Sequence, residues 1–205
     1  MVINWYGEGC FKVQTGGQTL LIDPDISSSG LTAPRGKVEA TLRTLTPWPI
    51  LPAEEEGRVV RGPGEYEVQG VEVGGFGLPK ESTENFLKTV YLVKAEGLSL
   101  CFLGHMTDYP DADLYEELKP VDLLFIPAGG KPFLKQELAA KLIKQLEPKI
   151  IVASFFKVPG LKRSSDDVKS FAKELGLTAE SDEKLVIKKK EVSEQKGIRL
   201  IALSI

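Results

Sequence analysis

The sequence predicts a mixed α/β fold in which two β-sheets are flanked by helices. Short apolar runs of β type fill the first half of the chain, and the apolar period becomes helical in the second half, where buried strands alternate with helices. Strands followed by alternating strands and helices are typical of two packed sheets with helices outside them. A length of 205 residues fits one sizeable core, so we expect residues 1–205 to form a single domain.

The first half of the chain is expected to consist of strands. One set of β-type runs covers residues 2–5, 11–15 and 19–22, and a second covers 58–61, 65–68, 71–73, 89–94 and 98–103. Residues 23–52 lose this regularity, because the run Ser27-Ser28-Ser29-Gly30 and several prolines interrupt them. We expect a long irregular loop there, of the kind that is usually functional or disordered.

The second half is expected to alternate helices with buried strands. Helices are predicted at residues 111–118 and 135–146. A third helix should begin at Ser164, which with Asp167 resembles a capping box, and end at Gly176. Strands are predicted at 123–126, 150–154, 185–188 and 198–203.

The composition excludes two classes of partner. A net charge of -3 gives no general attraction to nucleic acid or to anionic membranes, and no apolar run approaches the ~20 residues of a membrane helix. The N-terminal residues lack the pattern of a signal peptide, and Cys10 and Cys101 are expected to be reduced, buried and structural. We therefore expect a cytoplasmic protein of bacterial type.

Several short motifs occur in order along nearly the whole chain. They are Trp5-Tyr6-Gly7-Glu8-Gly9-Cys10-Phe11, Leu21-Ile22-Asp23-Pro24, Gly62-Pro63-Gly64-Glu65-Tyr66-Glu67, Phe102-Leu103-Gly104, Ile126-Pro127-Ala128-Gly129-Gly130, Glu147-Pro148-Lys149-Ile150 and Lys157-Val158-Pro159-Gly160. Together they resemble the metallo-β-lactamase fold superfamily, in particular its short bacterial Zn-dependent hydrolases similar to L-ascorbate-6-phosphate lactonase. The resemblance implies an αββα sandwich of the metallo-β-lactamase type.

The departures from that pattern fall on the residues that would bind metal. The family usually has His in the first Gly-x-x-Cys turn, where this chain has Glu8, and its His-x-His-x-Asp-His loop corresponds to Leu45-Thr46-Pro47-Trp48-Pro49-Ile50. The bridging Asp corresponds to His105 and a late His to Phe155. His105 is the chain's only histidine, whereas a catalytic zinc usually takes three protein ligands.

From this ligand count we expect no metal ligand, no cofactor and no catalytic residue. The chain would then be a degenerate, metal-free pseudoenzyme that acts as a binding or scaffold module. Pro, Leu, Ile and Phe side chains offer no lone pair to a metal. Because proline also removes backbone donors and restricts the loop, Trp48, Phe155 and Phe156 are expected to fill part of the former cleft. The expected residual-cleft residues are Glu8, Asp23, His105, Asp108 and Phe155.

Other interpretations stay open. A hydrolase could have rebuilt a metal site around His105, Asp23 and Asp108, a carboxylate-rich set that suits Mg or Mn. Cys10 and His105 could form a nucleophile and base, although nothing suggests a lowered thiol pKa. A binding module would act as a homo-oligomer, on a protein partner or on a small ligand, and the sequence does not choose among them.

Overall fold

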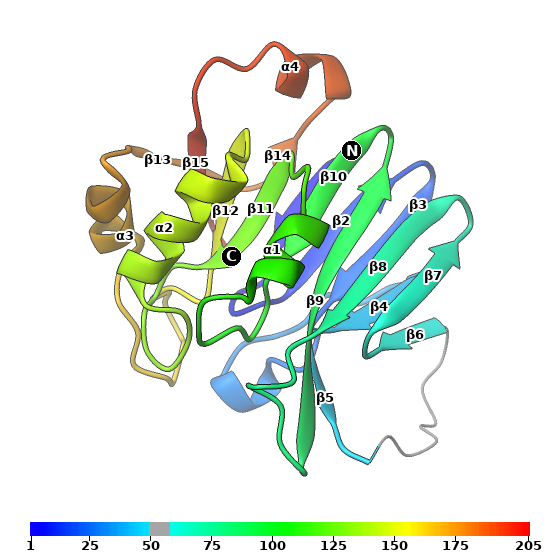
Figure 1. Cartoon of the computed structure of the whole chain (residues 1–205). Coiled ribbons are helices and arrows are strands. Elements are labelled where there is room, and N and C mark those ends of the chain that lie inside the picture. The colour runs from blue at the N-terminus through cyan, green and yellow to red at the C-terminus, as the bar shows by residue number, and fades with distance from the viewer. Residues whose placement is uncertain (50–57) are drawn as a thin grey trace.

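The computed structural model describes residues 1–49 and 58–205, which form two β-sheets lying face to face (Figure 1). The strands of the first sheet are β1 (Val2–Trp5), β2 (Phe11–Thr15), β3 (Gln18–Ile22), β4 (Ala40–Arg43), β6 (Arg58–Arg61) and β14 (Leu185–Val186). The second sheet contains β5 (Leu45–Pro47), β7 (Gly64–Val68), β8 (Val71–Gly77), β9 (Phe86–Ala95), β10 (Leu98–Phe102), β11 (Leu123–Pro127), β12 (Ile150–Ser154), β13 (Ala179–Asp182) and β15 (Arg199–Leu203).

Both sheets contain antiparallel and parallel pairs of strands. The six-stranded sheet runs β14-β1-β2-β3-β4-β6, and the nine-stranded sheet runs β13-β15-β12-β11-β10-β9-β8-β7, with β5 paired to β9. The helical elements are the 3-10 turn η1 (Ser27–Ser29), α1 (Ala112–Glu117), α2 (Gln136–Leu146), α3 (Val168–Leu175) and α4 (Lys189–Ser193). Helices α2 and α3 contact each other and lie beside the second sheet (Figure 1), which confirms the predicted two-sheet α/β fold.

The main core lies between the two sheets and is rich in aromatic side chains. The ring centroid of Phe11 on β2 lies 4.9 Å from that of Phe125 on β11, and Phe125 in turn stacks on Phe102 of β10 at 4.1 Å. Every residue of β10, β11 and β12 is buried, because the first sheet covers one face of these strands and helices lie against the other. This core fixes the ends of the strands that carry the candidate site.

Parallel pairing brings four strand ends to one edge of the sandwich. In the first sheet β3 is parallel to β4, and in the second β10, β11 and β12 are parallel to one another. The carboxyl ends of parallel strands meet at the same edge of a sheet, which is where ligands bind in many α/β folds. Asp23 follows β3, Thr44 follows β4, His105 follows β10 and Phe155 follows β12.

The prediction of an irregular loop at residues 23–52 is wrong for the part up to Pro49. The segment contains η1, β4 and β5, and β4 pairs in parallel with both β3 and β6. Strand β5 pairs with β9, a partner distant in sequence, so its pairing leaves no local signal in a proline-rich stretch. Residues 50–52 of that range lie outside the described part of the chain.

The second half differs from the prediction at the start of one helix, at the end of one strand and in two unpredicted elements. Helix α3 starts at Val168, and Asp167 is its N-cap, because the Asp167 side chain accepts a hydrogen bond from the Lys169 N–H; Ser164 lies outside the helix. Gly176 ends this helix as predicted, with φ of 66°. Strand β13 and helix α4 were not predicted, and the strand expected at 185–188 is limited to Leu185–Val186.

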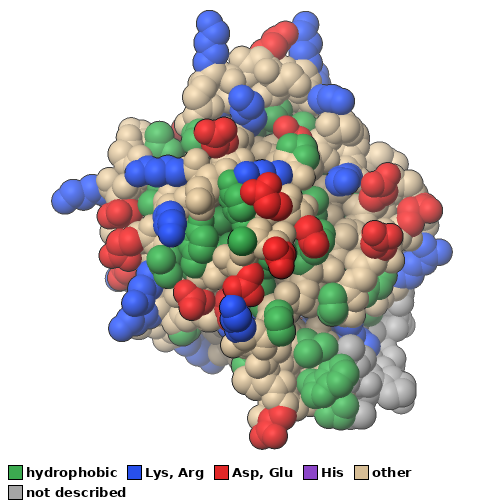
Figure 2. All heavy atoms as spheres, viewed as in Figure 1, with side chains coloured by type: hydrophobic (Ala, Val, Ile, Leu, Met, Phe, Trp, Pro, Cys, Tyr) green, Lys and Arg blue, Asp and Glu red, His purple; other side chains and the backbone are tan. Residues whose placement is uncertain are grey.

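None of the helices within residues 1–49 and 58–205 has the length and apolar character needed to cross a bilayer. Figure 2 shows acidic and basic side chains spread over one face of the molecule, with no histidine visible on that face.

Candidate functional site

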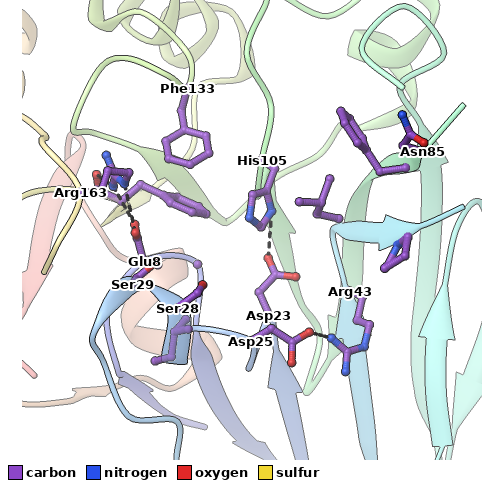
Figure 3. A pocket seen from close by; sticks show the side chains of 16 residues that line it. Glu8, Asp23, Asp25, Ser28, Ser29, Arg43, Asn85, His105, Phe133 and Arg163 are labelled. Carbon is purple, nitrogen blue, oxygen red and sulfur yellow. Dashed lines mark hydrogen bonds and ion pairs between the residues drawn. The ribbon is translucent and has the colours of Figure 1, made fainter. Parts of the chain in front are cut away.

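A cleft of about 420 Å³ lies at the edge where the four strand ends meet. Its lining includes Glu8, Asp23, His105 and Phe155, which are four of the five residues expected from the sequence, together with Arg163 (Figure 3). The fifth, Asp108, does not line this cleft. Its backbone N–H donates to Glu81 Oε1 at 3.1 Å.

Asp23, Thr44 and His105 form a hydrogen-bonded series at the centre of the cleft. The Asp23 carboxylate accepts the Thr44 N–H at 2.7 Å and the Thr44 hydroxyl at 2.5 Å. The Thr44 hydroxyl oxygen lies 2.7 Å from His105 Nδ1, and Asp23 Oδ2 lies 3.6 Å from the same nitrogen. The side chain of Asp23 is 8% exposed and that of His105 is 22% exposed, so the series is shielded from water but reaches the cleft.

The direction of these hydrogen bonds determines the tautomer of His105. The Thr44 hydroxyl has one hydrogen, which it donates to Asp23, so Nδ1 of the imidazole must donate to the hydroxyl oxygen. The neutral ring then carries no hydrogen on Nε2, and Nε2 makes no hydrogen bond to any residue in the described ranges. An imidazole held in this way presents a lone pair to whatever occupies the cleft.

Two glycines allow the series to assemble. Gly104 has φ of +53°, and a Cβ there would lie 2.1 Å from Thr44 Oγ1. A Cβ on Gly9 would lie 2.9 Å from Asp23 Oδ2 and 2.7 Å from Phe155 Cζ. Side chains larger than hydrogen at these positions would displace the residues of the cleft.

Glu8 and Arg163 close one side of the cleft. Arg163 Nε donates to Glu8 Oε1 at 3.0 Å and Nη2 donates to Glu8 Oε2 at 2.6 Å, a bidentate pair between side chains that are 20% and 8% exposed. Arg163 also donates to the carbonyl oxygens of Phe155 at 2.8 Å and Ser164 at 3.1 Å. The pair therefore fastens the segment that follows β12 to the first turn of the chain.

Three of the six described non-glycine residues with positive φ line this cleft, and the other three (Gln69, Glu96 and Glu147) lie elsewhere. Glu8, Asp23 and Phe155 have φ of 49°, 43° and 55°, in the left-handed region that non-glycine residues rarely adopt. Such conformations cost about 1–3 kcal/mol each, persist only where the surroundings impose them and cluster at functional sites. The three residues all line the cleft, which marks it as the candidate site of the fold.

Of the three aromatic residues expected to fill the cleft, only one lies in it. Phe155 lines the cleft, and its ring centroid lies 5.1 Å from that of His105. Phe156 points into the core and stacks on Trp5 at 4.5 Å. Trp48 is 46% exposed and is not among the lining residues. Of the three, only Phe155 narrows the cleft.

Both cysteines are buried and free, as the sequence predicted. Cys10 packs with Leu21, Ile26 and Leu31, and burial, with a smaller contribution from the Asp23 charge, raises its pKa to about 12. Burial also raises the pKa of Cys101. A thiol that stays protonated near neutral pH is a poor nucleophile, so the pairing of Cys10 with His105 as nucleophile and base is not supported.

Several residues that the structure brings into the cleft could not be selected from the sequence. Thr44, Arg163, Arg43 and Phe133 come from segments far apart in the chain, and only their contacts reveal them. Arg43 pairs with Asp25 on the side of the cleft opposite Arg163 (Figure 3). Thr44 directly follows β4, which is parallel to β3, but β4 was itself not predicted, so this position carried no signal in the sequence.

The loop that carries His105 is anchored by a second ion pair. Glu81 Oε2 accepts the Thr107 N–H at 2.7 Å, the Thr107 hydroxyl at 2.5 Å and Lys88 Nζ at 3.0 Å. The side chains of Glu81 and Lys88 are each 10% exposed. Strand β10 holds the residues before His105, and Glu81 holds the residues that follow it.

The pH dependence of the protein's stability should show that His105 is buried. Burial lowers the pKa of His105 below the ordinary 6.5, and the Lys88 and Arg163 charges act in the same direction against Asp23 and Glu8. A lowered folded-state pKa contributes stability above the unfolded pKa that is lost as the pH falls. We expect wild type to lose stability relative to His105→Gln between about pH 7 and pH 5. Denaturant unfolding at each pH measures this difference, and a constant difference would contradict it.

Most of the potential metal donors in this cleft already have partners in the protein. His105 Nε2 is one donor, whereas the oxygens of Asp23 accept from Thr44 and those of Glu8 accept from Arg163. Within the described ranges, no group of three or more His, Cys, Asp and Glu side chains is placed to hold a metal ion. These residues do not by themselves make the three-ligand set of a catalytic zinc.

Comparisons with known proteins agree with the fold. Residues 2–154 match the family model described as the β-lactamase superfamily domain. A UPF0173 metal-dependent hydrolase of Lysinibacillus sphaericus is 30% identical over 190 residues, covering 74% of this chain and 83% of that protein. A UPF0173 metal-dependent hydrolase of Shouchella clausii is 29% identical, covering 63% of this chain and 74% of that protein.

Solved structures give the same result. A Thermotoga maritima protein assigned to the Zn-dependent hydrolases of the metallo-β-lactamase superfamily superposes with a TM-score of 0.80 at 22% identity, over 99% of both chains. The metallo hydrolase Igni18 of Ignicoccus hospitalis superposes with a TM-score of 0.65 at 14% identity, over 91% of this chain and 99% of its own. At these identities the likeness concerns the fold alone.

The comparisons correct one expectation from the sequence. We expected no cofactor, and this is contradicted because the curated relatives are named metal-dependent hydrolases. The ligand count in the motifs was therefore an insufficient basis for excluding a metal.

Proposed function

Because the chain belongs to the β-lactamase superfamily, we propose that it is a hydrolase whose reaction takes place in the cleft at His105. The observation that supports this most directly is the Asp23–Thr44–His105 series, which leaves Nε2 of a shielded imidazole without a hydrogen and without a protein partner in the described ranges. A neutral imidazole oriented by a carboxylate is a frequent general base in enzymes.

In the proposed reaction, Nε2 of His105 takes a proton from a water molecule while that water's oxygen bonds to the electrophilic centre of the substrate. The buried charge of Asp23, acting through the Thr44 hydroxyl, stabilises the resulting imidazolium. The proton then passes from Nε2 to the leaving group as its bond to the electrophilic centre breaks. One water molecule is consumed, and the imidazole returns to its neutral form.

The metal dependence named for the relatives carries over to this chain as a proposal. A bound metal ion would supply Lewis-acid polarisation of the scissile group. The donor atoms of the described residues do not make up the usual ligand set, so every step above is derived from the chain's own residues. Assays of this proposal therefore compare protein treated with a chelator and protein supplied with Zn²⁺ or Mn²⁺.

A binding module without turnover is the second candidate. It is favoured by the absence of a nucleophile at the imidazole: within the described ranges, Thr44 carries the only hydroxyl hydrogen-bonded to His105, and its hydrogen is donated to Asp23. Action as a homo-oligomer, on a protein partner or on a small ligand stays a prediction, as do the cytoplasmic location and the lack of nucleic-acid or membrane binding.

Hydrolysis of a panel of aryl esters and lactones separates the two candidates. For a hydrolase, we expect His105→Gln to lower kcat/KM by roughly 100-fold or more, with or without added metal, because a general base typically contributes that much. Asp108→Asn is the control, because Asp108 lies outside the cleft, and it should leave kcat/KM unchanged. Equal activity of His105→Gln would overturn the proposed mechanism, and no turnover by wild type would favour the binding module.

A further inference from the structure

Both arginines that line the cleft already have carboxylate partners within it. Arg163 has five N–H hydrogens, and four of them are donated to Glu8, Phe155 and Ser164. A guanidinium with one N–H remaining cannot form the bidentate fork that holds a phosphate or carboxylate. Arg163 is thus occupied as a structural cation.

The second arginine of the cleft is also paired. Arg43, whose side chain is 14% exposed, forms an ion pair with Asp25 (Figure 3). Asp25 itself lines the cleft, so an anion approaching Arg43 would meet a carboxylate beside it. Burial lowers the pKa of His105, and a neutral imidazole adds no positive charge to the site.

The described lining therefore carries more carboxylates than cations. Glu8, Asp23 and Asp25 are acidic, whereas only Arg43 and Arg163 are permanently basic. Like charges placed in a partly desolvated site repel a ligand by several kcal/mol. A multiply charged anion would be disfavoured by the cleft as a whole.

The rest of the lining combines six apolar side chains with the uncharged polar residues Ser28, Ser29 and Asn85. Phe133 and Phe155 form one side, with ring centroids 4.2 Å apart, and both meet the His105 ring edge-on. Four further apolar residues lie along the lining, Ile26, Leu45, Pro47 and Phe86. Clefts of a few hundred Å³ in which aromatic and aliphatic walls are combined with placed polar groups are typical of small-molecule sites.

From the pairing of the arginines and these apolar walls, we infer that the cleft takes a small uncharged ligand with an aromatic or aliphatic group and discriminates against phosphorylated ligands. The inference rests on the proposed function in using the same cleft, and it names the ligand class of that site. It concerns binding, so it holds whether or not the bound molecule is then hydrolysed.

The single histidine makes the experiment selective, because the imidazole gives one Hε1 resonance in the NMR spectrum of the whole chain. Two probes with the same phenyl ring are titrated against it: acetanilide, which is neutral, and phenyl phosphate, which is anionic. We expect acetanilide to shift the His105 resonance with an affinity roughly tenfold or more above that of phenyl phosphate, a factor worth about 1.4 kcal/mol.

Glu8→Gln provides the matched gain-of-function variant. It keeps an amide oxygen for Arg163 but removes one negative charge from the cleft, so phenyl phosphate should bind roughly tenfold more tightly than to wild type. Asp108→Asn changes the net charge by the same amount outside the cleft and should leave the preference unchanged.

The outcomes distinguish this inference from the proposed function. Wild type binding phenyl phosphate as tightly as acetanilide, or no shift with acetanilide up to about 10 mM, would overturn the ligand class, since binding weaker than that is not specific. An unchanged preference in Glu8→Gln would overturn the role of the ion pair. Selective binding of acetanilide without hydrolysis of any ester would retain the ligand class and reject the hydrolase.

Discussion

Replacing Arg163 with methionine is expected to destabilise the folded protein by about 3 kcal/mol, because it leaves the buried Glu8 carboxylate without its partner. Glu8 is 8% exposed and accepts two hydrogen bonds from the guanidinium, and the Phe155 carbonyl oxygen loses a donor in the same variant. Removal of one member of a buried pair typically costs 3–5 kcal/mol, and the partial exposure of Arg163 places it at the lower end. Urea unfolding followed by circular dichroism measures the difference.

Two controls isolate the buried charge in this prediction. Arg199→Met breaks a similar bidentate pair with Glu180, but those side chains are 34% and 44% exposed, so we expect a loss below about 1 kcal/mol. Adding Glu8→Gln to Arg163→Met should recover part of the lost stability, because no bare carboxylate then stays buried. Equal losses for Arg163→Met and Arg199→Met would show that the Glu8 charge is solvated in the folded state.

Gly104→Ala is expected to cost about 3 kcal/mol and to disrupt the series at His105. The new methyl group would lie 2.1 Å from Thr44 Oγ1 and 2.3 Å from its Cβ, so Thr44 or the loop must move. Overpacking of this kind costs about 1–3 kcal/mol, and the left-handed backbone at φ of +53° adds about 1 kcal/mol for a residue with a Cβ. Chemical denaturation gives the loss, and the His105 NMR resonance reports the displacement.

Gly16→Ala separates the two contributions. Gly16 has nearly the same backbone conformation, φ of +55°, but a Cβ there would meet nothing within 4 Å. It should therefore cost only about 1 kcal/mol and leave the His105 resonance in place. Matching losses for the two alanine variants would mean that the contact with Thr44 carries no cost.

The sequence predicted most of the fold because local patterns and motif order both pointed to it. Strands β2 and β12 follow from apolar runs bounded by turn residues, and the motifs placed Glu8, His105 and Phe155 at strand ends. Strands β4 and β5 escaped prediction because their pairing with β3, β6 and β9 joins segments distant in sequence. The β-propensity of a proline-rich segment does not reflect such long-range pairing.

The candidate site was harder to predict than the fold for the same reason. Arg163 reaches Glu8 across 155 residues of sequence, and Thr44 reaches His105 across 61. Asp108 lies close to His105 in sequence, but its backbone N–H is bonded to Glu81 and it does not line the cleft. Proximity along the chain was therefore a poor guide to side chains that meet in the cleft.

The anchoring of the His105 loop by Glu81 has a thermodynamic consequence. Because the Thr107 and Asp108 amides are already bonded to Glu81, the loop loses its conformational entropy when the chain folds. Little of that entropy then remains to be lost when a molecule enters the cleft. The imidazole is offered in a single orientation before any encounter, so contacts made with it count almost fully toward affinity.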